Sequence, residues 1–225
     1  MSFCLNCLNE YHEASWSDLY AGDSLCPSCY GKFKPRLEGF SFLGHRAYVL
    51  YEYSDFFKTA LYRFKGCSDI AMAPVFLCKS ALFLRFFFRG YTLVPAPSHE
   101  EDNAERGFNH VEEIFKRLHL PMAKVLRKTE RVKQAGSTLE ARKEVGKRLA
   151  IEGGDALRDK KILFVDDVFT TGSTAAACAR LILSRKPKSL SFFFLSKVSK
   201  RGSDHRAFFG SKEPQLPSCA HDGII

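Results

Sequence analysis

The pattern of apolar and polar positions predicts buried strands that are followed by helices. Residues 162–165 form an unbroken apolar run, which is typical of a central parallel strand buried on both faces. Helix-forming residues occupy positions 175–183, after a short polar loop. This order indicates an α/β fold built on a parallel sheet.

The same reading along the chain predicts the other elements. They are strands at 45–53, 91–94 and 189–195, and helices at 55–65, at 71–88 and after Asn109. Ser54 is expected to cap the first of these helices, which ends at Gly66. The helix at 71–88 is expected to bury most of its surface, and the last strand to lie beside residues 162–165.

The turn after residues 162–165 carries the strongest candidate chemistry. Two carboxylates, Asp166 and Asp167, are expected at the surface where the strand ends. A strand, a short Gly loop and a helix start form a phosphate site, because free backbone N–H groups and the helix dipole point into the loop. The loop consists of Thr170, Thr171, Gly172, Ser173 and Thr174. The acids would repel a phosphate, so sugar hydroxyls or a divalent cation are their natural partners.

A plain surface turn with an acidic helix cap is the alternative interpretation of this stretch. Two other phosphate-binding patterns are absent from the sequence, the Gly-x-x-x-x-Gly-Lys-Ser/Thr loop and the Gly-x-Gly-x-x-Gly loop. A second loop, 95–98, follows the strand at 91–94. Ligands of open α/β sheets sit beyond the carboxyl ends of the strands, so we expect this loop to line the same crevice as the two acids.

Four of the eight cysteines lie in the first 29 residues, in two Cys-x-x-Cys pairs separated by 18 residues. This spacing is typical of a zinc site with four thiolate ligands. Four protein ligands leave no open position for water, so the zinc is predicted to be structural. The expected ligands are Cys4, Cys7, Cys26 and Cys29. His12 as a substitute ligand, a disulfide pair and coincidental thiols are the alternatives.

Positive charge is concentrated in one region of a chain whose formal net charge is +9. Residues 116–148 contain eleven Lys or Arg against three Glu, a local excess of eight. Such a region suggests a surface that faces a polyanion, and a solubilising basic loop is the alternative. The candidate nucleic-acid contacts are Lys124, Arg127, Lys128 and Arg131.

Composition indicates a globular chain with ample material for a core, since 45% of its residues are hydrophobic and 21 are Phe. The longest apolar region, 71–88, is interrupted by Pro74, Lys79 and Arg85, so no transmembrane segment is predicted. We expect a cytoplasmic protein that can also act at the inner face of the membrane.

The segment 165–174 resembles the phosphoribosyl pyrophosphate (PRPP) signature of type I phosphoribosyltransferases. The resemblance implies that Asp166 and Asp167 contact the ribose hydroxyls, with magnesium, and that the Thr/Gly loop holds the 5′-phosphate. The second loop resembles the pyrophosphate loop of the same enzymes. Its implied site residues are Ala96, Pro97, Ser98 and Arg106.

The order of the motifs over residues 1–198 resembles the ComF family of competence-associated proteins. The resemblance rests on the four-Cys start, the Arg-Gly-Phe-Asn element at 106–109, the Leu-Arg-Lys-Thr stretch at 126–129 and the PRPP signature. It implies a small zinc module at 1–40, a parallel-sheet phosphoribosyltransferase-like domain at 41–199 and an irregular tail at 200–225. Residues 144–151 depart from the family pattern, so their role is open.

Three functions follow from these motifs. The first is a competence protein that binds PRPP and single-stranded DNA and acts with a ComFA-like helicase in DNA uptake, a partnership that the resemblance implies. The second is an active phosphoribosyltransferase acting on a nucleobase or nucleic acid, for which the sequence identifies no base pocket and no catalytic residue. The third is an inactive scaffold that bridges uptake proteins.

Overall fold

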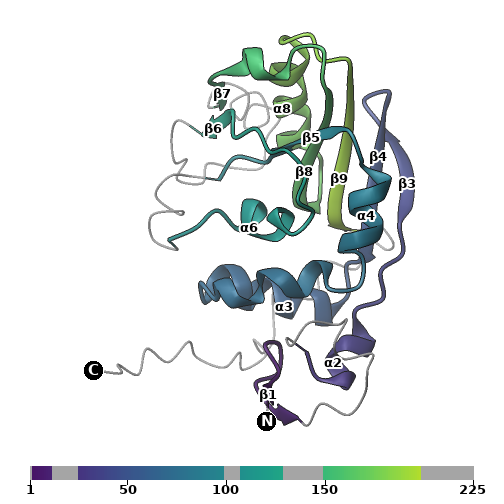
Figure 1. Ribbon diagram of the computed structural model, residues 1–225, viewed down its shortest axis with the longest axis vertical. Helices are drawn as coiled ribbons and strands as arrows, with labels where there is room; N and C mark the ends of the chain where they lie inside the picture. Colours follow the sequence, from purple (N-terminus) through teal and green to yellow (C-terminus); the bar gives the residue numbers. More distant parts are fainter. Residues whose placement is uncertain (1, 12–24, 99–106, 129–148, 199–225) are drawn as a thin grey trace, which may run out of the picture.

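A five-stranded, mostly parallel β-sheet forms the centre of the protein (Figure 1). This computed structural model describes residues 2–11, 25–98, 107–128 and 149–198. The strand order is β3-β4-β9-β8-β5, in which β3 pairs antiparallel with β4 and the other neighbours are parallel. The five strands are β3 (Glu38–Phe42), β4 (His45–Glu52), β5 (Tyr91–Pro95), β8 (Lys161–Phe169) and β9 (Ser189–Lys197). The predicted mixed α/β fold with a mostly parallel sheet is confirmed.

Helices and two short antiparallel ribbons complete the described chain (Figure 1). The helices are α2 (Pro27–Lys32), α3 (Asp55–Gly66), η1 (Ile70–Leu77), α4 (Ala81–Phe87), α6 (His110–Lys116), η2 (Gly154–Leu157) and α8 (Ser173–Leu183). The ribbons pair β1 (Ser2–Phe3) with β2 (Glu10–Tyr11) and β6 (Leu126–Lys128) with β7 (Leu149–Ile151).

The alternating side chains of β9 join two aromatic layers on opposite faces of the sheet. Phe193 packs against Phe88 and Phe115, from the segment after α4 and from α6. Phe192 and Phe194 point the other way and contact Phe42 and Phe40 respectively. The rings meet mostly edge to face, a geometry that adds about 0.5–1.5 kcal/mol per pair beyond simple burial. Residues 162–165 of β8 are all 0% exposed, so this strand is buried on both faces, as its continuous apolar run predicted.

Most predicted elements are confirmed within a residue or two. Ser54 caps α3, where its hydroxyl accepts a hydrogen bond from the Phe57 N–H at 3.3 Å. The helix predicted after Asn109 is α6, whose apolar residues Val111, Ile114 and Phe115 are buried. As predicted, β9 lies beside β8.

The single helix predicted over 71–88 is wrong. The segment divides into η1, a 3-10 helix that contains Pro74, and α4, with a bend of 66° between their axes. Proline lacks the N–H that would continue an α-helix and clashes with the preceding turn, which explains the break. The expected burial is also wrong for α4, whose exposed apolar side chains include Leu82, Phe83 and Phe86, the last 74% exposed.

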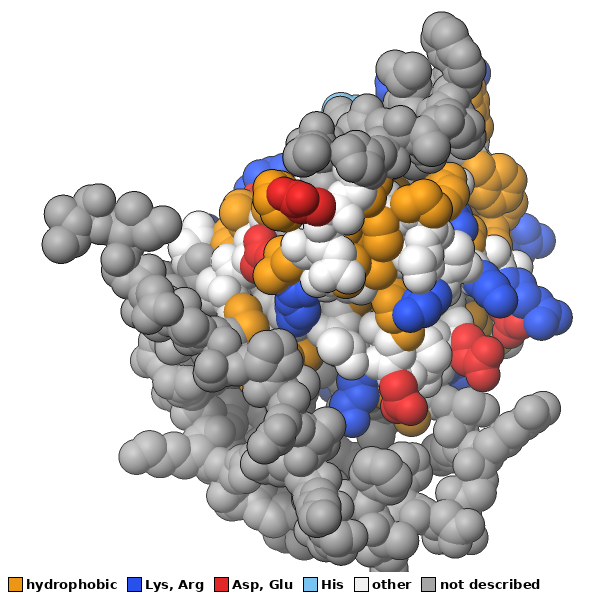
Figure 2. Space-filling model, turned by 90° about the horizontal axis from the view of Figure 1, so that it is seen from below, with side chains coloured by type: hydrophobic (Ala, Val, Ile, Leu, Met, Phe, Trp, Pro, Cys, Tyr) orange, Lys and Arg blue, Asp and Glu red, His pale blue; other side chains and the backbone are white. Residues whose placement is uncertain are grey.

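No single described helix is long and apolar enough to cross a membrane. The bent pair η1 and α4 passes the length and composition criteria only when its two helices are taken together. Seen from the end where β1 and α2 lie, apolar side chains stand among Lys and Arg side chains, with acidic ones interspersed (Figure 2). On this face the described surface therefore carries both signs of charge.

Candidate functional site

The turn between β8 and α8 places a glycine directly before the first residue of the helix. Gly172 adopts a left-handed conformation with φ +73°, and a Cβ there would approach the Phe169 and Phe42 rings to 2.8 Å. Only glycine fits both the backbone and the space. The helix begins at Ser173, so its first N–H groups, which have no partner inside the helix, border the loop. The strand, glycine turn and helix predicted from the sequence are confirmed.

Hydroxyl groups line this turn at its exposed side. Thr170 and Thr171 are exposed, and Ser173 and Thr174 are half-buried at the start of α8. The hydroxyl oxygens of Thr171 and Ser173 lie 3.0 Å apart. The loop therefore offers both backbone and side-chain donors to an anion.

The acidic pair is placed differently from the prediction. The strand does not end before Asp166, because β8 continues through both acids to Phe169. Asp167 is only 6% exposed, so the expectation that both carboxylates lie at the surface is wrong. The hydrogen-bonded pairing of β8 with β9 continues past the acids to Phe169, which carries them into the sheet.

Two basic side chains contact the carboxylate of Asp167. Lys65, in the last turn of α3, forms an ion pair with Asp167 Oδ2. The His110 Nε2 atom, at the start of α6, lies 3.2 Å from the same oxygen. The other oxygen accepts a hydrogen bond from the Val168 N–H at 2.6 Å. Three elements that are distant in sequence therefore meet at this carboxylate.

The two acids titrate in opposite directions. Burial alone would raise the pKa of Asp167, but the hydrogen bond from His110 and the charge of Lys65 more than offset it, so this pKa is lowered. Burial, and next the charge of Asp167, raise the pKa of Asp166 to about 8. At neutral pH the pair therefore carries one negative charge and offers one donor as well as acceptors, which suits vicinal sugar hydroxyls.

Replacing Asp166 with asparagine is expected to change how stability depends on pH. Between about pH 4 and 8 the folded protein holds a proton on Asp166 that the unfolded chain releases, since the ordinary pKa is 3.8. This contribution to stability decreases as the pH rises through that window. The difference in unfolding free energy between wild type and Asp166→Asn should change by about 2 kcal/mol between pH 5 and 7 in urea titrations.

The exposed residue Asp155 provides the control for this measurement. The Asp155→Asn variant should follow the wild type at both pH values. An Asp166→Asn difference that stays constant from pH 5 to 7 would contradict a raised pKa at this carboxyl.

The second predicted loop lies beside the carboxyl end of β8. The Ala96 N–H donates to the Val165 carbonyl oxygen at 2.8 Å, immediately before the acidic pair. A pocket opens at this loop and is lined by Pro95, Ala96, Pro97, Ser98, Asn109, Glu112, Lys124, Leu126, Arg127 and Lys128. Asn109 lines the pocket and the next residue, His110, contacts Asp167, so α6 connects the pocket to the acids. Arg106 lies outside the described residues.

Three of the four predicted nucleic-acid residues line this same pocket. Lys124 forms an ion pair with Glu112 of α6, and Arg127 Nε lies 3.1 Å from Glu152 Oε2. Lys128 is the third cation that lines the pocket. The fourth predicted residue, Arg131, lies outside the described residues. The sequence assigned these cations and the loop 95–98 to separate sites, whereas the fold brings them together.

Sequence reasoning missed Lys65, His110 and Glu112. Nothing in the helical pattern of α3 distinguishes Lys65 from a solvated basic residue. His110 and Glu112 follow the Arg-Gly-Phe-Asn element closely, and that proximity was the one available signal.

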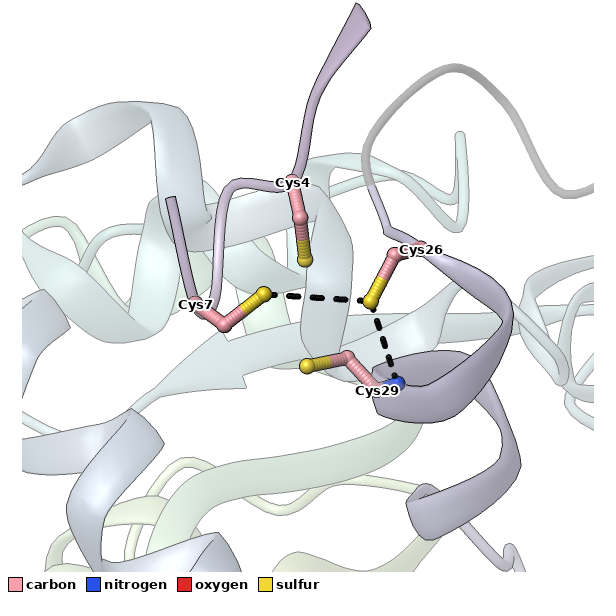
Figure 3. A group of neighbouring side chains, drawn as sticks. All are labelled: Cys4, Cys7, Cys26 and Cys29. Atoms are coloured by element: carbon pink, nitrogen blue, oxygen red, sulfur yellow. Dashed lines mark hydrogen bonds between the residues drawn. The ribbon is translucent and has the colours of Figure 1, made fainter. Parts of the chain in front are cut away.

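The four N-terminal cysteines converge on one point (Figure 3). Their Sγ atoms all lie within 4.8 Å of one another, and those of Cys7 and Cys26 are 3.8 Å apart. Tetrahedral zinc with Zn–S distances of about 2.3 Å requires sulfur atoms about 3.8 Å apart. The Asn6 side-chain amide donates to Cys29 Sγ at 3.4 Å, a contact that stabilises a thiolate. The cluster fits a structural metal ion, and His12 lies outside the described residues.

The cysteine segment shares its core with the sheet. The Phe33 ring, just after α2, is 1% exposed and packs edge to face against Tyr51, Phe56 and Phe76. Arg63 of α3 donates to the carbonyl oxygen of Asn6. The division into domains at residues 40 and 199 stays a prediction, and the tail after residue 199 lies outside the described residues.

Comparison with known proteins identifies a curated relative. The chain is 30% identical to competence protein ComFC of Bacillus subtilis (strain 168) over 154 residues, which cover 65% of this chain and 62% of that protein. It is 28% identical to competence protein ComFC of Streptococcus pneumoniae (strain ATCC BAA-255 / R6) over 155 residues, or 68% of each chain. The chain is homologous to ComFC. The resemblance inferred from motif order is confirmed, and the match spans less than two thirds of the B. subtilis ComFC.

No protein-family model matches the chain. The similar solved structures are type I phosphoribosyltransferases. Adenine phosphoribosyltransferase of Saccharomyces cerevisiae aligns with a TM-score of 0.40 and 15% identity, covering 77% of this chain and 90% of that one. A hypoxanthine phosphoribosyltransferase from Staphylococcus aureus aligns with a TM-score of 0.34 and 15% identity, covering 60% and 73%.

Proposed function

We propose that this ComFC homologue is a cytoplasmic protein of natural transformation that binds PRPP with magnesium and single-stranded DNA, and that acts with a ComFA-like helicase in DNA uptake. The homology to ComFC supports the competence context. One observation carries the proposed ligand: the acidic pair, the β8–α8 loop and the loop 95–98 lie together at the carboxyl ends of adjacent strands.

Each part of PRPP has a matching set of groups in this arrangement. The hydroxyls of the β8–α8 loop and the free N–H groups of α8 would hold the 5′-phosphate. Asp166 and Asp167 would bind the ribose hydroxyls or the magnesium ion. Loop 95–98 and the cations of the adjacent pocket would hold the diphosphate, and magnesium would neutralise part of its charge.

The same cations support DNA binding. Lys124, Arg127 and Lys128 are concentrated on one short stretch of chain, and such cations bind phosphodiester backbones without reading sequence. Anisotropy of a fluorescent oligothymidine at low salt measures this part of the proposal. Replacing all three cations with glutamine should abolish the binding or weaken it strongly.

Calorimetric titration tests the PRPP site. The wild type should bind PRPP in the presence of Mg²⁺, and a Thr170→Val, Thr174→Val variant should bind at least tenfold more weakly. Each lost hydrogen bond to a charged phosphate costs about 1.5–3 kcal/mol. Thr59→Val on the exposed face of α3 is the matched control and should bind like the wild type.

The alternatives give different results in the same experiments. If titrating PRPP and Mg²⁺ into the wild type gives no heat of binding, the protein would instead be a scaffold that bridges uptake proteins. Release of pyrophosphate from PRPP in the presence of one nucleobase from a panel would instead identify a working phosphoribosyltransferase.

A further inference from the structure

The pocket beside loop 95–98 combines features that the proposed function assigns to two ligands. One wall is the loop expected to hold a diphosphate. Another consists of Lys124, Arg127 and Lys128, which are expected to hold a DNA backbone. Both ligands are polyanions, and one group of cations cannot neutralise two polyanions at the same place.

Among the described residues that line this pocket, Glu112 contributes the one carboxylate. Its side chain is 15% exposed and forms an ion pair with Lys124, whose side chain is 57% exposed. Glu152, the partner of Arg127, is 67% exposed and does not line the pocket. Glu112 is therefore a fixed negative charge at the place where the ligand's phosphates would lie.

A fixed carboxylate affects the two ligands differently. It repels the oxygens of a phosphodiester and competes with them for Lys124. A diphosphate brings Mg²⁺, which proteins typically bind through one or two carboxylates together with the substrate phosphates. Glu112 therefore opposes DNA and favours a diphosphate that carries its metal ion.

We propose that magnesium PRPP and single-stranded DNA exclude each other from this pocket, and that Glu112 sets the preference between them. This inference rests on the proposed function, because it requires that each ligand bind alone. PRPP then acts as a release signal for DNA. The diphosphate, and not the ribose 5-phosphate part, is the competing group.

Competition between ligands provides the first test. Labelled oligothymidine bound to the full-length protein is titrated with magnesium PRPP, magnesium pyrophosphate or ribose 5-phosphate at constant ionic strength and free Mg²⁺. PRPP and pyrophosphate should displace the oligonucleotide, with an apparent DNA Kd that rises in proportion to ligand concentration. Ribose 5-phosphate, which is expected to occupy only the β8–α8 loop and the acidic pair, should leave the DNA bound.

The variant Glu112→Gln tests the role of the carboxylate. Removing one charge next to the bound phosphates should tighten DNA binding about fivefold at low salt. The ratio of PRPP affinities with and without Mg²⁺ should fall by a similar factor. The matched control is Glu113→Gln, the neighbouring residue on α6, whose carboxylate pairs with Lys116 and does not line the pocket. It should leave both affinities unchanged.

The outcomes separate this inference from the proposed function. If PRPP or DNA fails to bind the wild type alone, both are wrong. If each binds alone but a ternary complex forms with unchanged DNA affinity, the proposed function stands and the exclusion is wrong. Equal effects of Glu112→Gln and Glu113→Gln would refute the role of Glu112.

Discussion

Removing metal from the four-cysteine cluster is expected to destabilise the whole described fold and not only its first residues. Structural zinc contributes about 10 kcal/mol or more to the folding of small cysteine sites. The cluster anchors α2, and Phe33 after α2 belongs to the same aromatic core as Tyr51 of β4. We therefore expect a strong chelator to lower the melting temperature of the entire chain.

Elemental analysis and thermal unfolding check this result. The purified protein should hold one zinc ion per chain, and Cys26→Ser should lose the metal together with much of its stability. Cys78, which lies outside the cluster, is the matched control. The Cys78→Ser variant should keep a full complement of zinc. A chelated protein with an unchanged melting temperature would show that the cluster does not hold a structural metal.

Replacing Asp167 with asparagine is expected to lower the unfolding free energy by about 2–3 kcal/mol. Breaking a buried ion pair by removing one partner typically costs 3–5 kcal/mol. The expected loss is smaller than this because the Lys65 side chain is 32% exposed and can turn toward water when Asp167 is gone. It is not negligible, because the His110 side chain is 11% exposed and cannot reach water as easily. Urea unfolding at pH 7 measures the difference.

The control is Glu38→Gln, which makes the same carboxylate-to-amide change in an exposed ion pair with Arg36. That variant should lose less than about 1 kcal/mol. A double-mutant cycle with Lys65→Met isolates the contribution of the Asp167–Lys65 ion pair. The loss of unfolding free energy caused by Asp167→Asn should be smaller in the Lys65→Met background. Equal losses for Asp167→Asn and Glu38→Gln would contradict the structural role of Asp167.

Protonating Asp167 with acid should lower the unfolding free energy, as Asp167→Asn does. The pKa of Asp167 is lowered in the fold, so its contribution to stability is complete above the ordinary value of 3.8 and is lost as the pH falls further. The raised pKa of Asp166 acts in the separate window from about pH 4 to 8. Unfolding measured at pH 3 and at pH 6 therefore reports on different members of the pair.

Because Asp167 is buried, the fold and the binding site have to be tested with different variants. Asp167 both supports the fold and faces the proposed ligand, so loss of binding in an Asp167 variant would not by itself identify a ligand contact. Thr170 is exposed and Thr174 is half-buried, and the hydroxyls of both can be removed without breaking a buried ion pair. For this reason the loop variants carry the binding test, and Asp167 carries the stability test.

Local sequence determined the elements of the fold and the identity of several groups. The apolar run at 162–165, the glycine at 172 and the helix formers that follow specify a strand, a left-handed turn and a helix, because backbone preference and burial act over a few residues. Cysteine spacing likewise specified the cluster. Pro74 was visible too, and its effect on the helix at 71–88 was underestimated.

Tertiary structure alone decided which groups meet. Lys65 and His110 converge on Asp167 because α3 and α6 both pack against η1. Glu112 meets Lys124 because α6 runs beside the chain before β6. Their separations along the sequence carry no signal, since packing of distant elements sets these distances. The sequence therefore specified a glycine turn before a helix and a basic region, and only the folded chain brought Lys124, Arg127 and Lys128 to the loop at 95–98.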